Sequence, residues 1–200
     1  MVLLILHSAV GMYVDLKVYW LMDESIPESE LDSDAIFVWQ SWAAALSIPD
    51  ILLMIITRLS LIAWMYRCHR NLESLGHRVL DSKHVWVIIC WFVPLLNLYC
   101  PFLVMREIWW RSYPGAENSL EQAPASYLVF WWWLLNVTAV IGTYFASTFS
   151  SYQTWPQYHV FLRTSLLSWA CEIACEILAI VIIHRISGWQ IARNQLLSQR

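Results

Sequence analysis

The sequence predicts an all-α integral membrane protein with four transmembrane helices and one proline-broken re-entrant hairpin. Five transmembrane helices are the alternative. Of the 200 residues, 59% are hydrophobic and 14% are charged, whereas a soluble domain carries about 25% charged residues. Several apolar runs reach the roughly 20 residues that a helix needs to cross the hydrocarbon core. Several of the fourteen tryptophans lie at the ends of these runs, where amphipathic rings favour the headgroup level.

The first two apolar runs are separated by an acidic stretch. Residues 2–22 are predicted to form a retained first helix, because no basic segment precedes them. Residues 23–34 contain six acids and neither Lys nor Arg. The second run, 35–66, would be about 48 Å long as a straight helix, which is too long for one span. We therefore expect a kink near Pro49 and a cytoplasmic helical extension over about 59–76, which stops at a left-handed C-cap, Gly76.

The cytoplasmic extension is predicted to be amphipathic, with two stripes that follow the helical period. The apolar stripe consists of Leu61, Trp64 or Met65, Cys68, Leu72 and Leu75. The polar stripe consists of Arg67, Arg70, Asn71 and Ser74. The extension is therefore expected to pack against protein along one face only.

Three further apolar runs complete the chain. The third covers about 84–104 and contains Pro94, Asn97 and Pro101. The fourth and fifth cover about 126–148 and 159–184, and a tail of about 186–200 has the pattern of an interfacial amphipathic helix. Neither an internal repeat nor a separate soluble domain is recognisable. Residues 1–200 are therefore predicted to form a single polytopic membrane domain.

Loop charges favour the hairpin over a fifth span, because cytoplasmic loops are enriched in Lys and Arg. The acidic 23–34 loop belongs outside. The loop before the third run belongs inside, because it carries Arg67, Arg70, Arg78 and Lys83. If the third run crossed, Arg106, Arg111 and the basic tail would lie outside. If it turns back between Pro94 and Pro101, all of them lie inside. We therefore predict the hairpin and two cytoplasmic termini.

Three stretches, 64–76, 91–101 and 104–114, resemble the bacterial membrane family catalogued as domain of unknown function 4328. The matching residues are Trp64, Arg67, Asn71 and Leu72 in the first, Trp91, Phe92, Pro94, Asn97, Leu98 and Pro101 in the second, and Met105, Arg106, Glu107 and Trp109 in the third. Ile108 stands where the family has Leu. The resemblance implies a multi-helix protein of the bacterial inner membrane, and it implies nothing about catalysis.

Charged residues inside the predicted spans are candidates for function, because burying them in hydrocarbon is costly. Glu172 and Glu176 lie one turn apart on one face of the fifth run, and Asp50 and Arg58 lie in the second. These four residues form a possible ion or proton path. The alternatives are a structural ion pair of the glutamates with Arg58 or Arg106, or a contact with another subunit.

The cytoplasmic side offers a lipid site and a structural latch. Arg67, Arg70, Arg78 and Lys83 are candidates for binding anionic lipid headgroups, and ordinary positive-inside topology is the alternative. Arg67 is expected to pair with Glu107 at the mouth of the hairpin. Asn71 is expected to cap a broken helix, and the Asn97 amide to satisfy backbone groups that the turn leaves free.

No cofactor or metal is predicted. The five cysteines lack a ligand or disulfide spacing and are expected to be small buried hydrophobes. A haem held by two of His7, His84 and His184 is an open alternative. Without a basic stripe, nucleic acid is not expected as a partner.

No motif for nucleophilic, metal or nucleotide chemistry occurs, so we predict that the protein is not an enzyme. The first hypothesis is a non-catalytic subunit, scaffold or sensor of an integral membrane assembly that acts through helix–helix oligomerisation. Its expected partners are the bilayer, other membrane subunits or copies of itself, and anionic lipid. The alternative is a small ion- or proton-conducting channel or transporter with Glu172 and Glu176 in its path.

Overall fold

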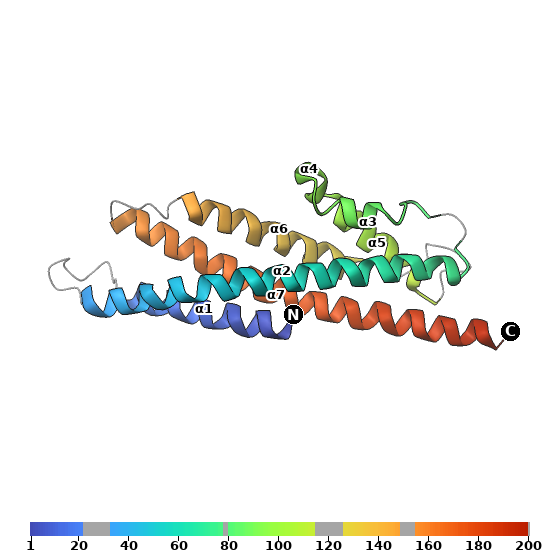
Figure 1. Cartoon of the computed structure of the whole chain (residues 1–200), viewed down its shortest axis with the longest axis horizontal. Helices are drawn as coiled ribbons and strands as arrows, with labels where there is room; N and C mark the ends of the chain where they lie inside the picture. The colour runs from blue at the N-terminus through green and yellow to red at the C-terminus, as the bar shows by residue number, and fades with distance from the viewer. Residues whose placement is uncertain (22–32, 78–79, 115–125, 149–154, 200) are drawn as a thin grey trace. The chain divides into compact units, whose positions relative to one another are not determined.

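The computed structural model describes residues 1–21, 33–77, 80–114, 126–148 and 155–199, and these residues form helices and turns without strands. Most of the acidic 23–34 stretch, Arg78 and the turn at 149–154 lie outside the described residues. The long helices are α1 (Val2–Leu21), α2 (Ser33–Ser74), α6 (Tyr127–Thr148) and α7 (Trp155–Ser198). Three shorter helices follow α2 and precede α6 along the chain (Figure 1): α3 (Trp86–Ile89), α4 (Pro94–Asn97) and α5 (Cys100–Ser112).

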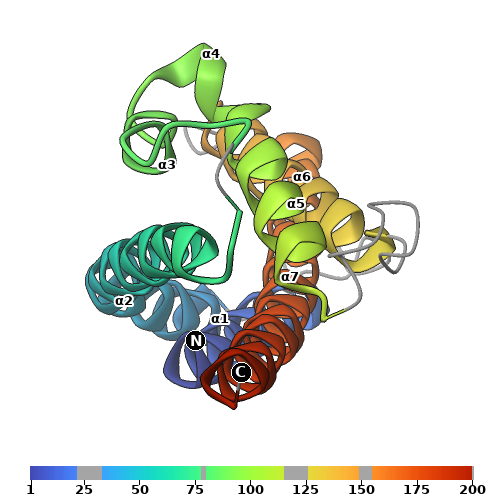
Figure 2. The same ribbon diagram turned by 90° about the vertical axis from the view of Figure 1, so that its right-hand side faces the viewer.

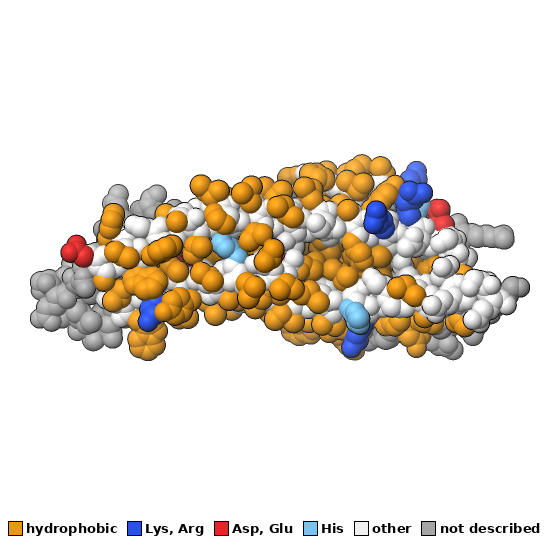
Figure 3. All heavy atoms as spheres, turned by 60° about the horizontal axis from the view of Figure 1, so that its bottom comes forward, with side chains coloured by type: hydrophobic (Ala, Val, Ile, Leu, Met, Phe, Trp, Pro, Cys, Tyr) orange, Lys and Arg blue, Asp and Glu red, His pale blue; other side chains and the backbone are white. Residues whose placement is uncertain are grey.

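Four of the described helices, α1, α2, α6 and α7, are long and apolar enough to cross a membrane. The predicted all-helical class with four such helices is therefore confirmed. α2 has 42 residues and α7 has 44, about twice what one span requires. Hydrophobic side chains cover most of the face drawn in Figure 3, and charged side chains are few on it. An exposed apolar surface of this kind suits contact with acyl chains.

The chain divides into two compact units. Unit 1 consists of Met1–Ile56 and Leu134–Ile177. It contains α1, the first parts of α2 and α7, and the second part of α6. α1 buries a stripe that includes Leu4, Ser8, Gly11, Asp15 and Val18, which repeats with the helical period. Polar side chains thus share the buried face of α1 with apolar ones.

A small apolar core lies at one end of unit 1. Val18 of α1, Ile36 of α2, and Tyr158 and Leu162 of α7 are all buried there. The Tyr158 hydroxyl accepts a hydrogen bond from Nε2 of Gln40 at 3.1 Å, so the buried phenol has a polar partner. This core joins three helices whose sequences are far apart in the chain.

Unit 2 consists of Thr57–Trp133 and Leu178–Arg200, and the predicted amphipathic extension of α2 lies in it. The predicted apolar stripe is confirmed, since Leu61, Met65, Cys68, Leu72 and Leu75 are all buried. The predicted stop is confirmed as well. Gly76 has φ +95°, its N–H donates to the Glu73 carbonyl, and the N–H of His77 donates to the Leu72 carbonyl. These two bonds define a Schellman motif, which needs a left-handed residue at the position of Gly76.

The third apolar run is broken into α3, α4 and the start of α5. Figures 1 and 2 show the chain reversing direction at α4. Pro94 begins α4, as its fixed φ favours, and the Leu98 carbonyl accepts a hydrogen bond from Trp133 Nε1 at 3.1 Å. The Asn97 side-chain oxygen has no hydrogen-bond partner in the described part of the chain. The role predicted for the Asn97 amide is thus filled instead by the Trp133 indole.

The C-terminal tail differs from the prediction of a span followed by a separate amphipathic helix. α7 continues without interruption from Trp155 to Ser198. In the amphipathic pattern of the tail, Arg193 belongs to the polar face and Leu196 to the apolar face. In the structure Arg193 is buried and Leu196 is exposed. The tail packs against α2 and α5 within unit 2. Its buried face is therefore determined by the polar contacts described below as well as by hydrophobicity.

Candidate functional site

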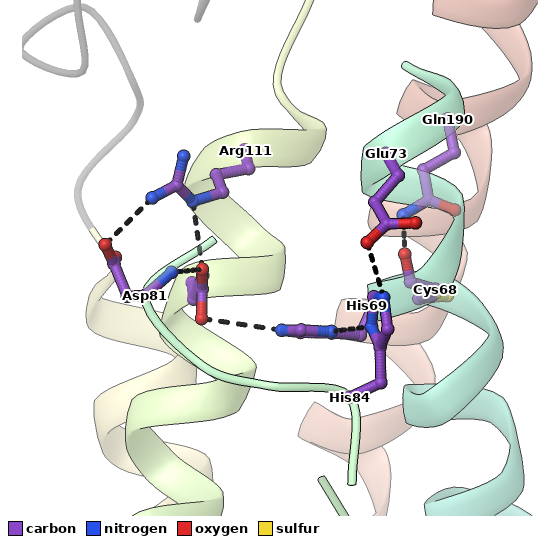
Figure 4. A network of polar contacts seen from close by, with 8 residues as sticks. Cys68, His69, Glu73, Asp81, His84, Arg111 and Gln190 are labelled. Carbon is purple, nitrogen blue, oxygen red and sulfur yellow. Dashed lines mark hydrogen bonds and ion pairs between the residues drawn. The ribbon is translucent and has the colours of Figure 1, made fainter. Parts of the chain in front are cut away.

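A chain of ion pairs and hydrogen bonds runs through unit 2 and joins α2, α5 and the segment 80–85 (Figure 4). At its centre, Nδ1 of His69 lies 2.7 Å from Nδ1 of His84. We call these residues the histidine pair. Each ring directs its Nε2 at a carboxylate, since His84 lies 2.8 Å from Glu73 Oε1 and His69 lies 3.5 Å from Glu107 Oε2. The pair is therefore bracketed by two acids.

The chain continues beyond Glu107 to the protein surface. Oε1 of Glu107 accepts the backbone N–H of Asp81 at 2.6 Å and Nε of Arg111 at 3.1 Å. Arg111 also pairs with Asp81 at 3.0 Å. The end groups are exposed, with 63% of the Glu73 side chain and 76% of the Asp81 side chain accessible, while His69 and Glu107 are buried. A buried charged centre is thus connected at both ends to solvent.

The contact limits how many protons the histidine pair can hold in this geometry. A contact of 2.7 Å between two imidazole nitrogens requires one N–H and one lone pair. Consider the form in which both carboxylates are ionised and each Nε2 that faces one carries a proton. The pair then holds three protons and a single positive charge, shared across the bridge and balanced by Glu73 and Glu107. A fourth proton would place two N–H groups against each other.

Local structure explains why these side chains meet. His69 lies on the buried face of α2 between Met65 and Leu72, and Glu107 shares the buried face of α5 with Val104 and Ile108. His84 reaches α2 because the chain turns back after the Schellman motif at Gly76. The site therefore depends on the packing of two helices and on the path of one connecting segment.

The Gln190 side chain of α7 ties the same helices together. Its Nε2 donates to the Cys68 carbonyl at 3.0 Å and to Ser112 Oγ at 2.9 Å, and its Oε1 accepts from Asn71 Nδ2 at 3.0 Å. Nearby, Nη1 of Arg193 donates to the Arg111 carbonyl at 2.9 Å. Buried polar groups satisfied in this way favour one packing arrangement over others.

The protonation of Glu107 reflects opposing effects. Burial raises the pKa of this carboxyl, but contacts with His69, the Asp81 backbone N–H and Ser82 outweigh burial and place the pKa below its ordinary value. The ionised form is therefore favoured in the folded protein. Stabilisation from a depressed pKa is present above the ordinary value and is lost as the pH falls through the folded one.

We expect the stability difference between the wild type and Glu107→Gln to shrink on acidification below about pH 4.5, the ordinary pKa of this group. The reason is that protonation of Glu107 removes the same charge as the substitution. Unfolding midpoints in mild detergent between pH 3 and pH 6 measure this difference. A difference that stays constant over this range would contradict the expectation.

Unit 1 contains a second group of polar contacts, centred on α1. Asp15 accepts hydrogen bonds from Ser165 and from Trp169 Nε1, the latter at 2.9 Å. About two helical turns earlier in α1, Ser8 donates to Glu172 at 3.1 Å. His7 lies 3.4 Å from Asp50. The interfaces that α1 forms with α2 and α7 therefore both contain carboxylates.

The predicted intramembrane charges are distributed between the units. Glu172 contacts Ser8, Glu176 is buried, and Asp50 pairs with His7, all in unit 1. In unit 2, the Arg58 guanidinium lies over the ring of Trp91 at 5.9 Å. Asp50 and Arg58 therefore have different partners, one in each unit.

Three of the predicted family positions contact α7. Trp64 Nε1 donates to Ser187 at 3.3 Å, and Asn71 to Gln190. Trp109 packs edge-to-face with Trp189 at 4.7 Å. Asn71 thus links two long helices instead of capping a broken one.

The predicted pair of Arg67 with Glu107 is wrong. Glu107 lies with His69 and Arg111, while Arg67 is exposed on the opposite face of α2. Arg106 stacks over Phe102 and Trp110, at 5.5 Å and 4.8 Å. Helical position explains the error, because Arg67 lies two positions before His69 and therefore points away from the α5 side of the helix.

The predicted headgroup residues fall into two groups. Arg67, Arg70 and Lys83 are exposed, and Arg78 lies outside the described residues.

Pro94 is exposed near the tip of the broken segment, and Pro101 is buried at the start of α5. Within the described ranges, no three His, Cys, Asp or Glu side chains are placed to hold a metal ion.

The fold and the site define an all-helical protein with four helices able to cross a membrane and a partly buried network of histidines and carboxylates. The chain belongs to the family described as Domain of unknown function (DUF4328), whose model matches residues 28–188. This match confirms the family expected from the three sequence stretches. No curated protein and no solved structure matches the chain.

Proposed function

We propose that the protein is a non-catalytic subunit of an integral membrane assembly that senses protonation on its cytoplasmic side. The observation that carries this proposal is the 2.7 Å contact between His69 and His84, held between two carboxylates. Imidazole is the side chain that changes charge near neutral pH. A bridge that accepts only one shared proton converts that change into a change of structure.

The expected response is release of the segment 80–85 from α2 on acidification. A fourth proton sets two N–H groups against each other, so the rings must separate. The groups that face the pair are Tyr66 and Glu73 of α2 and Glu107 of α5. Because His69 is buried between packed helices, His84 is the ring that moves.

Thiol labelling tests the sensor directly. In a background without the native cysteines, Lys83→Cys reports on the segment and Leu196→Cys, at an exposed site of α7, corrects for thiol ionisation. We expect the ratio of the two labelling rates to rise as the pH falls from 8 to 5.5, and to lose this dependence when His69→Gln is added. An identical pH profile with and without His69→Gln would refute the sensor.

The hairpin and the location in a bacterial inner membrane with cytoplasmic termini are part of the same proposal. Exposed apolar side chains at the tip of the broken segment support membrane insertion, including Phe92, Leu98 and Leu95, the last 82% exposed. We expect an impermeant maleimide to label Trp20→Cys in intact cells and to leave both Lys83→Cys and Ser126→Cys unlabelled. Labelling of Ser126→Cys would instead indicate a fifth crossing.

Association with other helices is supported by the surface of α2. Ser41, Ala44 and Ala45 are exposed on it, and small residues let helices approach closely in a bilayer. In membranes we expect Ala45→Cys to form disulfide-linked dimers, or adducts with a companion subunit, more readily than Val10→Cys on α1. Equal cross-linking at both positions would argue against this face.

The second candidate function is conduction of protons or cations, with Glu172 and Glu176 in the path. It is favoured by the contacts of Ser165, Trp169 and Glu172 of α7 with α1. Glu176 is buried one turn further along α7. Carboxylates at such interfaces commonly mark proton or ion paths. Proteoliposomes with Glu172→Gln plus Glu176→Gln should then lose flux, while the exposed pair Glu73→Gln plus Asp81→Asn should retain it.

A further inference from the structure

A groove of about 720 Å³ lies along α2 in unit 2 and is closed on one side by α3 and Phe92. Its lining changes in character along α2. One end is apolar, with Leu59 and Ile62 of α2 facing Ile88 and Phe92. The other end carries Arg67 and Arg70. The groove is therefore amphipathic along its length, as a ligand with a charged head and an apolar tail requires.

The spacing of the two ends matches a membrane lipid. Leu59 and Arg70 are eleven residues apart on one helix, which corresponds to about 16 Å. Half of a bilayer hydrocarbon core is about 15 Å thick. An acyl chain lying against Leu59 would thus bring its phosphate to the level of Arg67 and Arg70.

The charge of the polar end suits a phosphate. Both arginines are exposed, and neither forms an ion pair with a carboxylate in the described part of the chain. The Arg70 guanidinium lies over the ring of Tyr66 at 5.9 Å, which orients it. The acid in the lining, Glu73, is held by His84 at 2.8 Å. A planar guanidinium group can bind two oxygens of one phosphate through two parallel hydrogen bonds.

We propose that this groove binds one anionic phospholipid, with its phosphate on Arg67 and Arg70 and one acyl chain along Leu59, Ile62, Ile88 and Phe92. This site shares Glu73 with the histidine–carboxylate network, but binding of the lipid at a fixed pH does not require proton sensing by the histidine pair. It gives the exposed arginines a ligand of defined chemistry rather than a role in topology alone.

Native mass spectrometry and lipid titration of the delipidated full-length protein test the site. The probes are phosphatidylglycerol, phosphatidylethanolamine and free glycerol phosphate. We expect Arg67→Gln plus Arg70→Gln to weaken phosphatidylglycerol binding about 30-fold, because each basic residue contributes about a factor of five. The matched control is Lys83→Gln plus Arg185→Gln, which removes the same charge from exposed positions outside the groove.

A third variant separates the groove from a charged surface. Ala63→Trp fills the apolar end without altering charge, since Ala63 is exposed in the lining, and we expect it to weaken binding too. The wild type should prefer phosphatidylglycerol to phosphatidylethanolamine and should not retain glycerol phosphate. The proposal would be overturned if the two double charge variants lost equal affinity for phosphatidylglycerol, or if Ala63→Trp bound this lipid normally. Retention of free glycerol phosphate by the wild type would also overturn it. Unfolding midpoints without lipid show that every variant is folded.

Discussion

Glu107→Gln is expected to destabilise the protein by about 3 kcal/mol, within the range for removing one partner of a buried ion pair. The carboxylate of Glu107 is the counter-charge of the histidine pair and also holds Arg111. Neither His69 Nε2 nor Glu107 Oε2 has another hydrogen-bond partner in the described part of the chain. A glutamine keeps only one acceptor oxygen and carries no charge, so the buried side of the histidine pair would lose its counter-charge and only the exposed Glu73 would remain opposite the pair.

Glu73→Gln is the matched control, because Glu73 is the other carboxylate of the same pair. Its side chain is largely exposed, and exposed ion pairs contribute about 0–1 kcal/mol. Unfolding of both variants in mixed detergent micelles at pH 7, monitored by tryptophan fluorescence, measures the two costs. Similar costs for both substitutions would mean that burial does not distinguish the two carboxylates that face the histidine pair.

The double variant Glu107→Gln with His69→Gln refines this test. The double variant removes both the buried carboxylate and the buried imidazole that faces it. We therefore expect the double variant to cost less stability than the sum of the two single substitutions. The coupling would then locate the effect in the ion pair rather than in the packing of α5. Strict additivity would place the loss with the Asp81 backbone contact instead.

The general features of the fold were accessible from sequence because they depend on local patterns. The buried stripe of α2 follows from apolar residues at helical spacing, and its end follows from the one residue type that tolerates φ +95° at Gly76. The long spans follow from length and hydropathy. Each of these features is determined by residues close together in the chain.

The candidate site was accessible only in part, because it depends on contacts between distant segments. Glu107 was singled out, but its partner His69 lies 38 positions away and His84 reaches α2 through a connecting segment without a recognisable pattern. Arg193 was expected on the polar face of an interfacial tail helix, and Gln190 was not singled out. A helical period shows which residues share a face, but it does not show whether that face meets solvent or the carbonyl of Arg111.

The same distinction applies to the lipid groove. Arg67 and Arg70 were visible as basic residues at the end of a span, which positive-inside topology also explains. The apolar wall that faces them, Ile88 and Phe92, comes from the broken segment. Its position depends on where that segment reverses, and the sequence supplied the prolines but not the direction of the turn.

Gly11→Ala is expected to destabilise unit 1 by about 1–3 kcal/mol, the usual cost of overpacking a close contact. A Cβ at Gly11 would lie 2.8 Å from Cζ2 of Trp169. The ring cannot withdraw freely, because its Nε1 donates to Asp15 at 2.9 Å. Helices α1 and α7 would have to separate, and that would also strain the contact of Ser8 with Glu172.

Gly188→Ala provides the matched control, since a Cβ at Gly188 in α7 meets nothing within 4 Å. There the added methyl only restricts the unfolded chain and favours helix, so we expect stabilisation of about 0.5–1 kcal/mol. Opposite signs for the same chemical change would show that the α1–α7 contact is tightly packed. In a Trp169→Leu background the cost of Gly11→Ala should fall, because the ring that it meets is gone. An unchanged cost in that background would mean that something other than the Trp169 contact requires glycine at position 11.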